Sequence, residues 1–226
     1  MKLKTLNSII KKKKTRSEFA IITNLSTGES EIYEKENPLN EDLKNYKNQI
    51  DQFLTLKKNG IIEGSEIFIE TYTLPVKVII VGAVHIAQYL VDYSKSLNFE
   101  IHIIDPRGYF ASKKRFPNVN IINKWPDQAF KELDTDKSTA LIALTHDPKI
   151  DDPALKHALD KRFYYIGALG SKKTHSNRCD RLKKSGYSHD QISLIHGPIG
   201  IKLGGKSASE IALSIISQLV FITNNR

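Results

Sequence analysis

The residues best suited to bind a ligand begin at Gly82, which follows the β-branched run of residues 78–81. A pattern with helical spacing comes next, and a second apolar run ends at Asp105. In dinucleotide-binding folds the first strand, turn and helix are followed by an acid that contacts a ribose about 20 residues after the glycines. Asp105 lies 23 residues beyond Gly82, which predicts a βαβ unit, although Val84 replaces the second glycine of that motif.

Ligands of open α/β sheets bind outside the carboxyl ends of the strands, so residues directly after each expected strand are candidates for the site. His85 and His146 are the candidate proton donors if the protein is an enzyme. His85 could instead be a partly buried histidine at a helix start, and Asp105 could cap its loop or pair with Arg107. The candidate ligand-binding residues are Gly82, Ala83, His85, Asp105, Arg107, Thr145, His146, Asp147, Gly167, Gly170, Ser171 and Lys172.

A second glycine loop, residues 167–171, precedes a helical segment and resembles a site for an anion. Its two glycines, Gly167 and Gly170, allow close approach of a ligand to the backbone, and Ser171 can cap the helix. Free N–H groups at a helix start favour a negative group, and Lys172 adds positive charge. A simple glycine turn with solvated lysines would give the same sequence.

The elements that position these residues fall into two parts. Residues 1–73 predict a small α+β module, with strands at 19–23, around Ile32 and at 67–69, and a helix over 43–56. In residues 74–226 strands alternate with helices, which predicts a parallel sheet covered on both faces. The expected strands are residues 78–81, 101–104, 119–122, 139–145 and 163–166. Expected helix starts are Pro126, Pro153 behind Asp151 and Asp152 as caps, Ser188 and Ser207.

Composition limits the class of protein. Every apolar run is shorter than the roughly 18 residues of a membrane span, and residues 1–16 lack the apolar segment of a signal peptide, so we expect a cytoplasmic protein with no membrane partner. The single cysteine, Cys179, excludes an intramolecular disulfide, and the histidines lack metal-ligand spacing, so no metal site is expected.

Positive charge is concentrated in the larger part. Residues 76–226 carry 22 Lys and Arg against 14 Asp and Glu, whereas residues 1–75 carry 12 against 11. Such a field attracts anions. No nucleic-acid-binding motif accompanies the charge, so nucleic acid is not an expected partner. The lysine run of residues 11–14 is typical of a solvated, mobile segment near a terminus.

Several blocks in residues 66–222 resemble the XdhC/CoxI family of accessory proteins, which assist molybdenum hydroxylases such as xanthine dehydrogenase. The resemblance implies a Rossmann-like C-terminal domain that binds the molybdenum cofactor (molybdopterin), protects it during sulfuration and passes it to the apo-hydroxylase. A cysteine desulfurase and a second copy of the chain are further implied partners. The blocks are residues 82–87, 105–107, 110–117, 145–147, 151–155, 165–171, 174–175 and 198–200.

The sequence departs from this family at two places. The family has Gly-Ala-Gly-His where this chain has Val84 as the third residue, and the isopropyl group could restrict a pyrophosphate. The N-terminal part is short and lacks the family's Gly-Gly-Cys motif. A non-catalytic cofactor-insertion chaperone is the leading hypothesis. The alternatives are an NAD(P)-dependent oxidoreductase and a scaffold with a degenerate nucleotide pocket.

Overall fold

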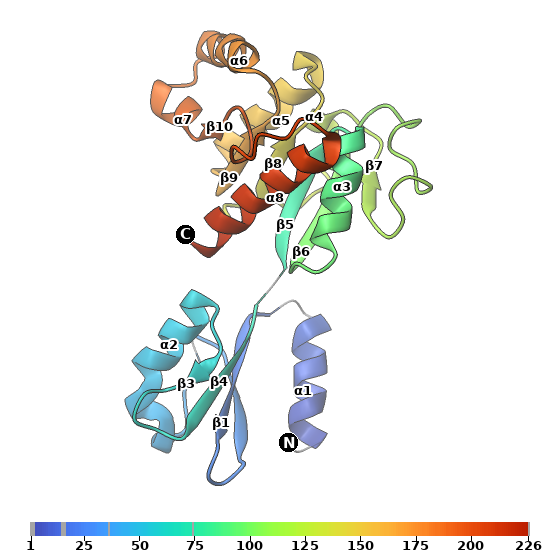
Figure 1. Ribbon diagram of the computed structural model, residues 1–226. Helices are drawn as coiled ribbons and strands as arrows, with labels where there is room; N and C mark the ends of the chain where they lie inside the picture. The colour runs from blue at the N-terminus through green and yellow to red at the C-terminus, as the bar shows by residue number, and fades with distance from the viewer. Residues whose placement is uncertain (1–2, 15–16, 36, 74, 226) are drawn as a thin grey trace. The chain divides into compact units, whose positions relative to one another are not determined.

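The computed structural model describes residues 3–14, 17–35, 37–73 and 75–225. It divides the chain into two compact units, residues 1–74 and residues 75–226 (Figure 1). None of the described helices is long and apolar enough to cross a membrane.

The N-terminal unit is built on an antiparallel sheet with the strand order β2-β1-β4-β3. Ala20 and Ile22 of β1 pack against Ile50 of α2, while Phe19 and Ile21 pack against α1 on the other face. Burial on both faces explains the continuous apolar run of β1. The elements are α1 (Leu3–Lys14), β1 (Phe19–Asn24), β2 (Ser30–Tyr33), the 3-10 helix η1 (Glu41–Tyr46), α2 (Lys47–Leu56), β3 (Gly60–Ile61) and β4 (Ile67–Tyr72).

The lysine run of residues 11–14, expected to be a solvated, mobile segment, lies in helix α1. Ile9, one turn earlier, is buried against β1. Lys12 forms an ion pair of 2.8 Å with Glu34. Ile9 packs α1 against β1, although charged residues dominate the sequence of this helix and hide its apolar face.

The second unit contains a parallel sheet with the strand order β10-β9-β8-β5-β6-β7. From β5 the chain proceeds through β6 and β7 on one side, then crosses to β8, β9 and β10 on the other, so the strand order reverses between β5 and β8. This confirms the expected Rossmann-like sheet. The strands are β5 (Val76–Val81), β6 (Phe99–Ile104), β7 (Asn120–Ile122), β8 (Ala140–Ala143), β9 (Tyr165–Ala168) and β10 (Ile195–His196).

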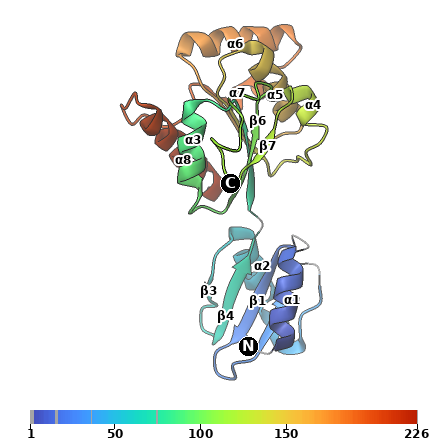
Figure 2. The same cartoon turned by 90° about the vertical axis from the view of Figure 1, so that its right-hand side faces the viewer.

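Helices cover both faces of this sheet, as expected (Figure 2). Leu90 of α3 (His85–Ser94) and Leu219 of α8 (Ala208–Asn224) belong to the core on one face. Leu155 of α5 (Pro148–Asp160) belongs to the core on the other face, together with residues from α4 (Pro126–Ala129), α6 (Lys172–Lys184) and α7 (His189–Ser193).

Three of the expected helix starts are confirmed and one is wrong. Pro126 occupies the first turn of α4, and Ser188 and Ser207 form capping boxes at α7 and α8. Pro153 lies inside α5, which begins five residues earlier at Pro148. The carboxylate of Asp147 accepts a hydrogen bond from the N–H of Lys149 and caps this helix, so Asp151 and Asp152 are not its caps.

Candidate functional site

The first glycine turn lies against the loop that follows β8. Gly82 has a φ of +109°, and a Cβ atom there would lie 2.6 Å from Cγ2 of Thr145. Both the backbone conformation and the available space therefore require glycine. The turn sits where the strand order reverses, which is the ligand-binding crevice of open α/β sheets.

Asp105 is fully buried and holds this turn in place. Its Oδ2 accepts hydrogen bonds from the N–H of Ala83 and from Nη2 of Arg107, each at 2.8 Å. Its Oδ1 accepts from the backbone N–H and from Nε of Arg107, each at 2.9 Å. Burial raises the pKa of Asp105, but the hydrogen bonds from Arg107 and Ala83 lower it by a larger amount. The pKa therefore lies below its usual value. The structure thus shows the pairing with Arg107 that the sequence left open.

Arg115 braces the same turn, and the sequence identified it only as part of a family block. Its Nη1 donates to the carbonyl oxygens of Ala83 and Phe110, both at 2.7 Å, and its Nη2 donates to Oε1 of Gln88 at 2.9 Å. These two carbonyl oxygens lie in loops and need hydrogen-bond donors from outside a sheet or helix. In the sequence, the only sign of this role was an arginine within a long loop.

A buried carboxylate holds the loop that follows β8, which contains Thr145 and His146. Asp151 accepts hydrogen bonds from Oγ1 of Thr145 at 2.6 Å, from the N–H of Thr145 at 3.2 Å and from the N–H of His146 at 3.0 Å. His146 takes a left-handed conformation with φ +60° and is exposed. Burial raises the pKa of Asp151 despite these donors. Asp151 therefore fixes the backbone of Thr145 and His146 from the buried side of the loop.

The second glycine loop lies beside His146. A Cβ atom at Gly170, which has a φ of +142°, would lie 2.9 Å from Cγ2 of Thr174 and 3.6 Å from Nδ1 of His146. Ser171 caps α6 by accepting a hydrogen bond of 3.1 Å from the N–H of Thr174. Lys172 is exposed at the first position of this helix. The start of α6 therefore lies beside the loop that follows β8.

Gly167 differs from Gly170 in its position. It lies inside β9, which extends two residues further than expected. A Cβ atom there would lie 2.3 Å from Cδ1 of Ile199, so glycine is needed for packing against the loop after β10.

A buried cation lies under the second glycine loop. Arg178 of α6 is 1% exposed and donates from Nη2 to the carbonyl oxygen of Leu169 at 2.8 Å. Within the part of the chain that the structure describes, its Nε has no hydrogen-bond partner. The pKa of Arg178 lies below its usual value, because burial lowers it by more than the charges of Asp151 and Asp152 raise it. Its positive charge therefore acts on the loop through a medium of low dielectric constant.

The first turn of α3 holds the remaining candidates. His85 is exposed, and its Nε2 lies 3.4 Å from the hydroxyl group of Tyr89 within the same helix. Val84 has φ −77° and ψ 175°, which any residue adopts, and its side chain packs against the core. The valine therefore causes no backbone strain where the family has glycine. Among the described residues, no three His, Cys, Asp or Glu side chains are grouped so that they could hold a metal ion.

Comparison with known proteins identifies the family of the second unit. The profile of the XdhC Rossmann domain matches residues 78–219, most of the second unit. The chain belongs to the XdhC family. This XdhC chain is 34% identical over 103 residues to the molybdenum cofactor insertion chaperone PaoD of Escherichia coli K12, which covers 46% of this chain and 32% of PaoD.

Two other proteins are similar to this XdhC chain. It is 24% identical over 132 residues to a probable xanthine dehydrogenase subunit of Bacillus subtilis 168, covering 58% of this chain and 38% of that protein. The chain thus spans about a third of the length of these two curated relatives. A crystal structure described as a xanthine dehydrogenase from Bacillus halodurans shares the fold, with a TM-score of 0.75 and 21% identity, covering 99% of this chain and 65% of the other.

Proposed function

We propose that this XdhC chain is an accessory protein that binds the molybdenum cofactor in the crevice between β5 and β8 and delivers it to an apo-hydroxylase of the xanthine dehydrogenase type. The observation that carries the proposal is that both glycine loops contact the loop after β8, since Gly82 lies against Thr145 and Gly170 lies beside the exposed His146. The cofactor carries a phosphate that is often extended by a nucleotide, and PaoD is named as an insertion chaperone for it.

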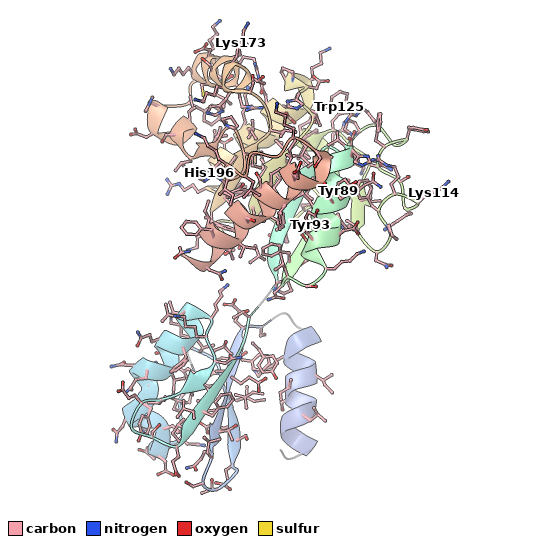
Figure 3. All side chains as sticks on the ribbon, in the orientation of Figure 1. Tyr89, Tyr93, Lys114, Trp125, Lys173 and His196 are labelled. Atoms are coloured by element: carbon pink, nitrogen blue, oxygen red, sulfur yellow. The ribbon has the colours of Figure 1, made fainter. Side chains whose placement is uncertain are left out.

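The residues around Gly170 suit the phosphate part of such a cargo. The first N–H groups of a helix have no partner within it, so the start of α6 next to Gly170 suits an anionic oxygen. Positive charge comes from the buried Arg178 and from the exposed Lys172. Lys173, next to Lys172, projects from α6 into solvent (Figure 3).

The geometry disfavours an NAD(P)-dependent oxidoreductase. An acid that reads a ribose must offer a free oxygen, whereas both oxygens of Asp105 already accept two hydrogen bonds each. Contact with a ribose would require Arg107 or the amide of Ala83 to give up a charge-assisted bond inside the protein, which costs about 1.5–3 kcal/mol.

The test is direct binding of purified molybdenum cofactor to the full chain, measured as bound molybdenum and pterin after gel filtration. We expect binding by the wild type and a loss of at least tenfold in Gly170→Trp, because a side chain there would displace Thr174 and the start of α6 beside His146. Gly186→Trp is the matched control, since Gly186 also has a positive φ and follows the other end of α6, where open space surrounds it.

Three results would contradict the proposal. Equal cofactor binding by Gly170→Trp and the wild type would place the ligand elsewhere. A wild type that binds no cofactor, with thermal stabilisation by NAD or NADP alone, would favour the oxidoreductase, since a ligand at 100 times its dissociation constant stabilises a protein by about 2.7 kcal/mol. No stabilisation by any of these ligands would favour the scaffold.

A further inference from the structure

We infer that the loop of residues 107–110 is a stacking surface for a planar nitrogen heterocycle, so that the crevice recognises a ring and an anion of the same ligand. This inference rests on the proposed function and assigns a part of the site that the glycine loops do not explain. It begins from two exposed aromatic side chains. Tyr109 is 89% exposed and Phe110 is 41% exposed, and their rings meet edge to face at 5.8 Å.

The loop that carries these rings is firmly held. The guanidinium group of Arg107 lies over the ring of Phe110 at 4.8 Å and is itself bound by both oxygens of the buried Asp105. The N–H of Phe110 donates to the carbonyl oxygen of Arg107 at 2.9 Å, and Phe116, further along the loop, is fully buried. The two aromatic rings are therefore presented by an ordered backbone, which lowers the entropic cost of binding.

The loop also lies next to the first glycine turn. A single nitrogen of Arg115 donates to the carbonyl oxygens of Ala83 and Phe110, both at 2.7 Å, so the two main chains are neighbours. A ligand whose anionic part approaches the glycine loops can thus place a ring near residue 110. The side chain of Arg107 is 40% exposed and offers a cation at the same rim.

The size of the surface favours a small heterocycle over a protein partner. Two aromatic side chains bury about 150–250 Å² each, whereas a stable protein interface needs about 800 Å² on each partner. Stacking of a base on an aromatic ring is worth about 1–3 kcal/mol, which corresponds to roughly 5- to 150-fold in affinity. A pterin and a nucleobase share this chemistry, and the molybdenum cofactor with its nucleotide extension contains both.

The experiment measures binding of three separate probes to the full chain by calorimetry: 6-hydroxymethylpterin, adenosine and inorganic pyrophosphate. We expect the double substitution Tyr109→Ala with Phe110→Ala to weaken binding of one ring probe at least tenfold and to change pyrophosphate affinity less than threefold. The identity of that probe separates a pterin site from a nucleobase site. Phe221→Ala is the matched control, because Phe221 is a 66% exposed aromatic residue on α8.

Trp125 provides a second readout, since it is the only tryptophan and is 44% exposed (Figure 3). It follows β7 by three residues, near Asn123, whose Nδ2 lies 3.9 Å from the Cβ position of Gly108. We expect bound pterin to quench its fluorescence in the wild type and not in the double variant.

Equal ring affinity in the wild type and the double variant would overturn the inference, as would binding of pyrophosphate but neither ring. Failure of the wild type to bind pyrophosphate, rings or intact cofactor would overturn the proposed function as well.

Discussion

Two buried carboxylates under the site have opposite electrostatic characters. Asp105 has a lowered pKa because the bonds from Arg107 and Ala83 outweigh its burial. Asp151 has a raised pKa because burial outweighs the donors of Thr145 and His146. Lowering the pH through the acidic range therefore removes a stabilising charge at Asp105 and relieves a costly charge at Asp151. Single variants are needed to separate the two effects.

We predict that Asp105→Asn destabilises the protein at neutral pH and that the loss shrinks in acid. The folded pKa is lowered, so the contribution of Asp105 is fully present above its ordinary pKa of about 3.9 and is lost as the pH falls through the folded value. Urea unfolding of the wild type and the variant between pH 7 and pH 3 measures the difference. Asp180→Asn, at an exposed position on α6, is the control. A difference that stays constant with pH would show that the charge of Asp105 is not the cause.

At the scale of elements, α6 begins directly after the second glycine loop, and the side chain of Ser171 caps its first turn. We predict that Ser171→Ala lowers the free energy of unfolding by about 0.5–2 kcal/mol, because the N–H of Thr174 loses its acceptor. It should also weaken pyrophosphate binding, since the cap fixes the start of the helix beside Gly170.

The matched control for this prediction is Ser188→Ala, which removes the equivalent cap of α7. Denaturant unfolding and pyrophosphate calorimetry on both variants provide the comparison. We expect a similar loss of stability in both, with weaker binding only in Ser171→Ala. If both variants bind pyrophosphate like the wild type, the start of α6 does not contribute to the anion site.

The sequence predicted the order of strands and helices in the second unit because their apolar periods are regular and their caps are local. It misjudged Asp151 because residues 151–153 resemble a helix start, and only tertiary packing decides that Asp147 is the cap while Asp151 turns inward. The role of Arg115 was equally hidden. Its partners, Ala83 and Phe110, come together only when the loop after β6 folds back.

The glycines show the same limit. The requirement for Gly170 could be predicted from a loop before a helix, whereas Gly167 looked equivalent in sequence and proves to be a packing position within β9. The strand β10 was not predicted, since two residues are too few for a recognisable period. In the first unit, the helix α1 was hidden by its charged residues.

At the scale of the whole molecule, the two units have separate hydrophobic cores and different charge. We predict that residues 75–226 fold alone and bind pyrophosphate with nearly the affinity of the full chain, because both glycine loops and Arg178 lie within them. Since residues 76–226 carry most of the excess positive charge, the affinity should fall as salt rises from 0.15 M to 1 M and the screening length decreases from about 8 Å to about 3 Å.

Calorimetry on the fragment and the full chain at both salt concentrations tests this prediction. Cooperative thermal unfolding of the fragment would establish that it is folded. A folded fragment that does not bind pyrophosphate would mean that residues 1–74 contribute to the site. An affinity that is independent of salt would mean that the positive field of the second unit does not attract the ligand.

The bridge made by Arg115 has a consequence for the speed of exchange. One guanidinium group joins the turn at Ala83 to the loop at Phe110, and that loop is held again through Arg107 and Asp105. Opening the loop would break several charge-assisted bonds at once. Under the proposed function, we therefore expect the bound cofactor to leave at a rate set by its own contacts and not by a hinge. A recipient enzyme would then hasten transfer by competing for the exposed side of the ligand.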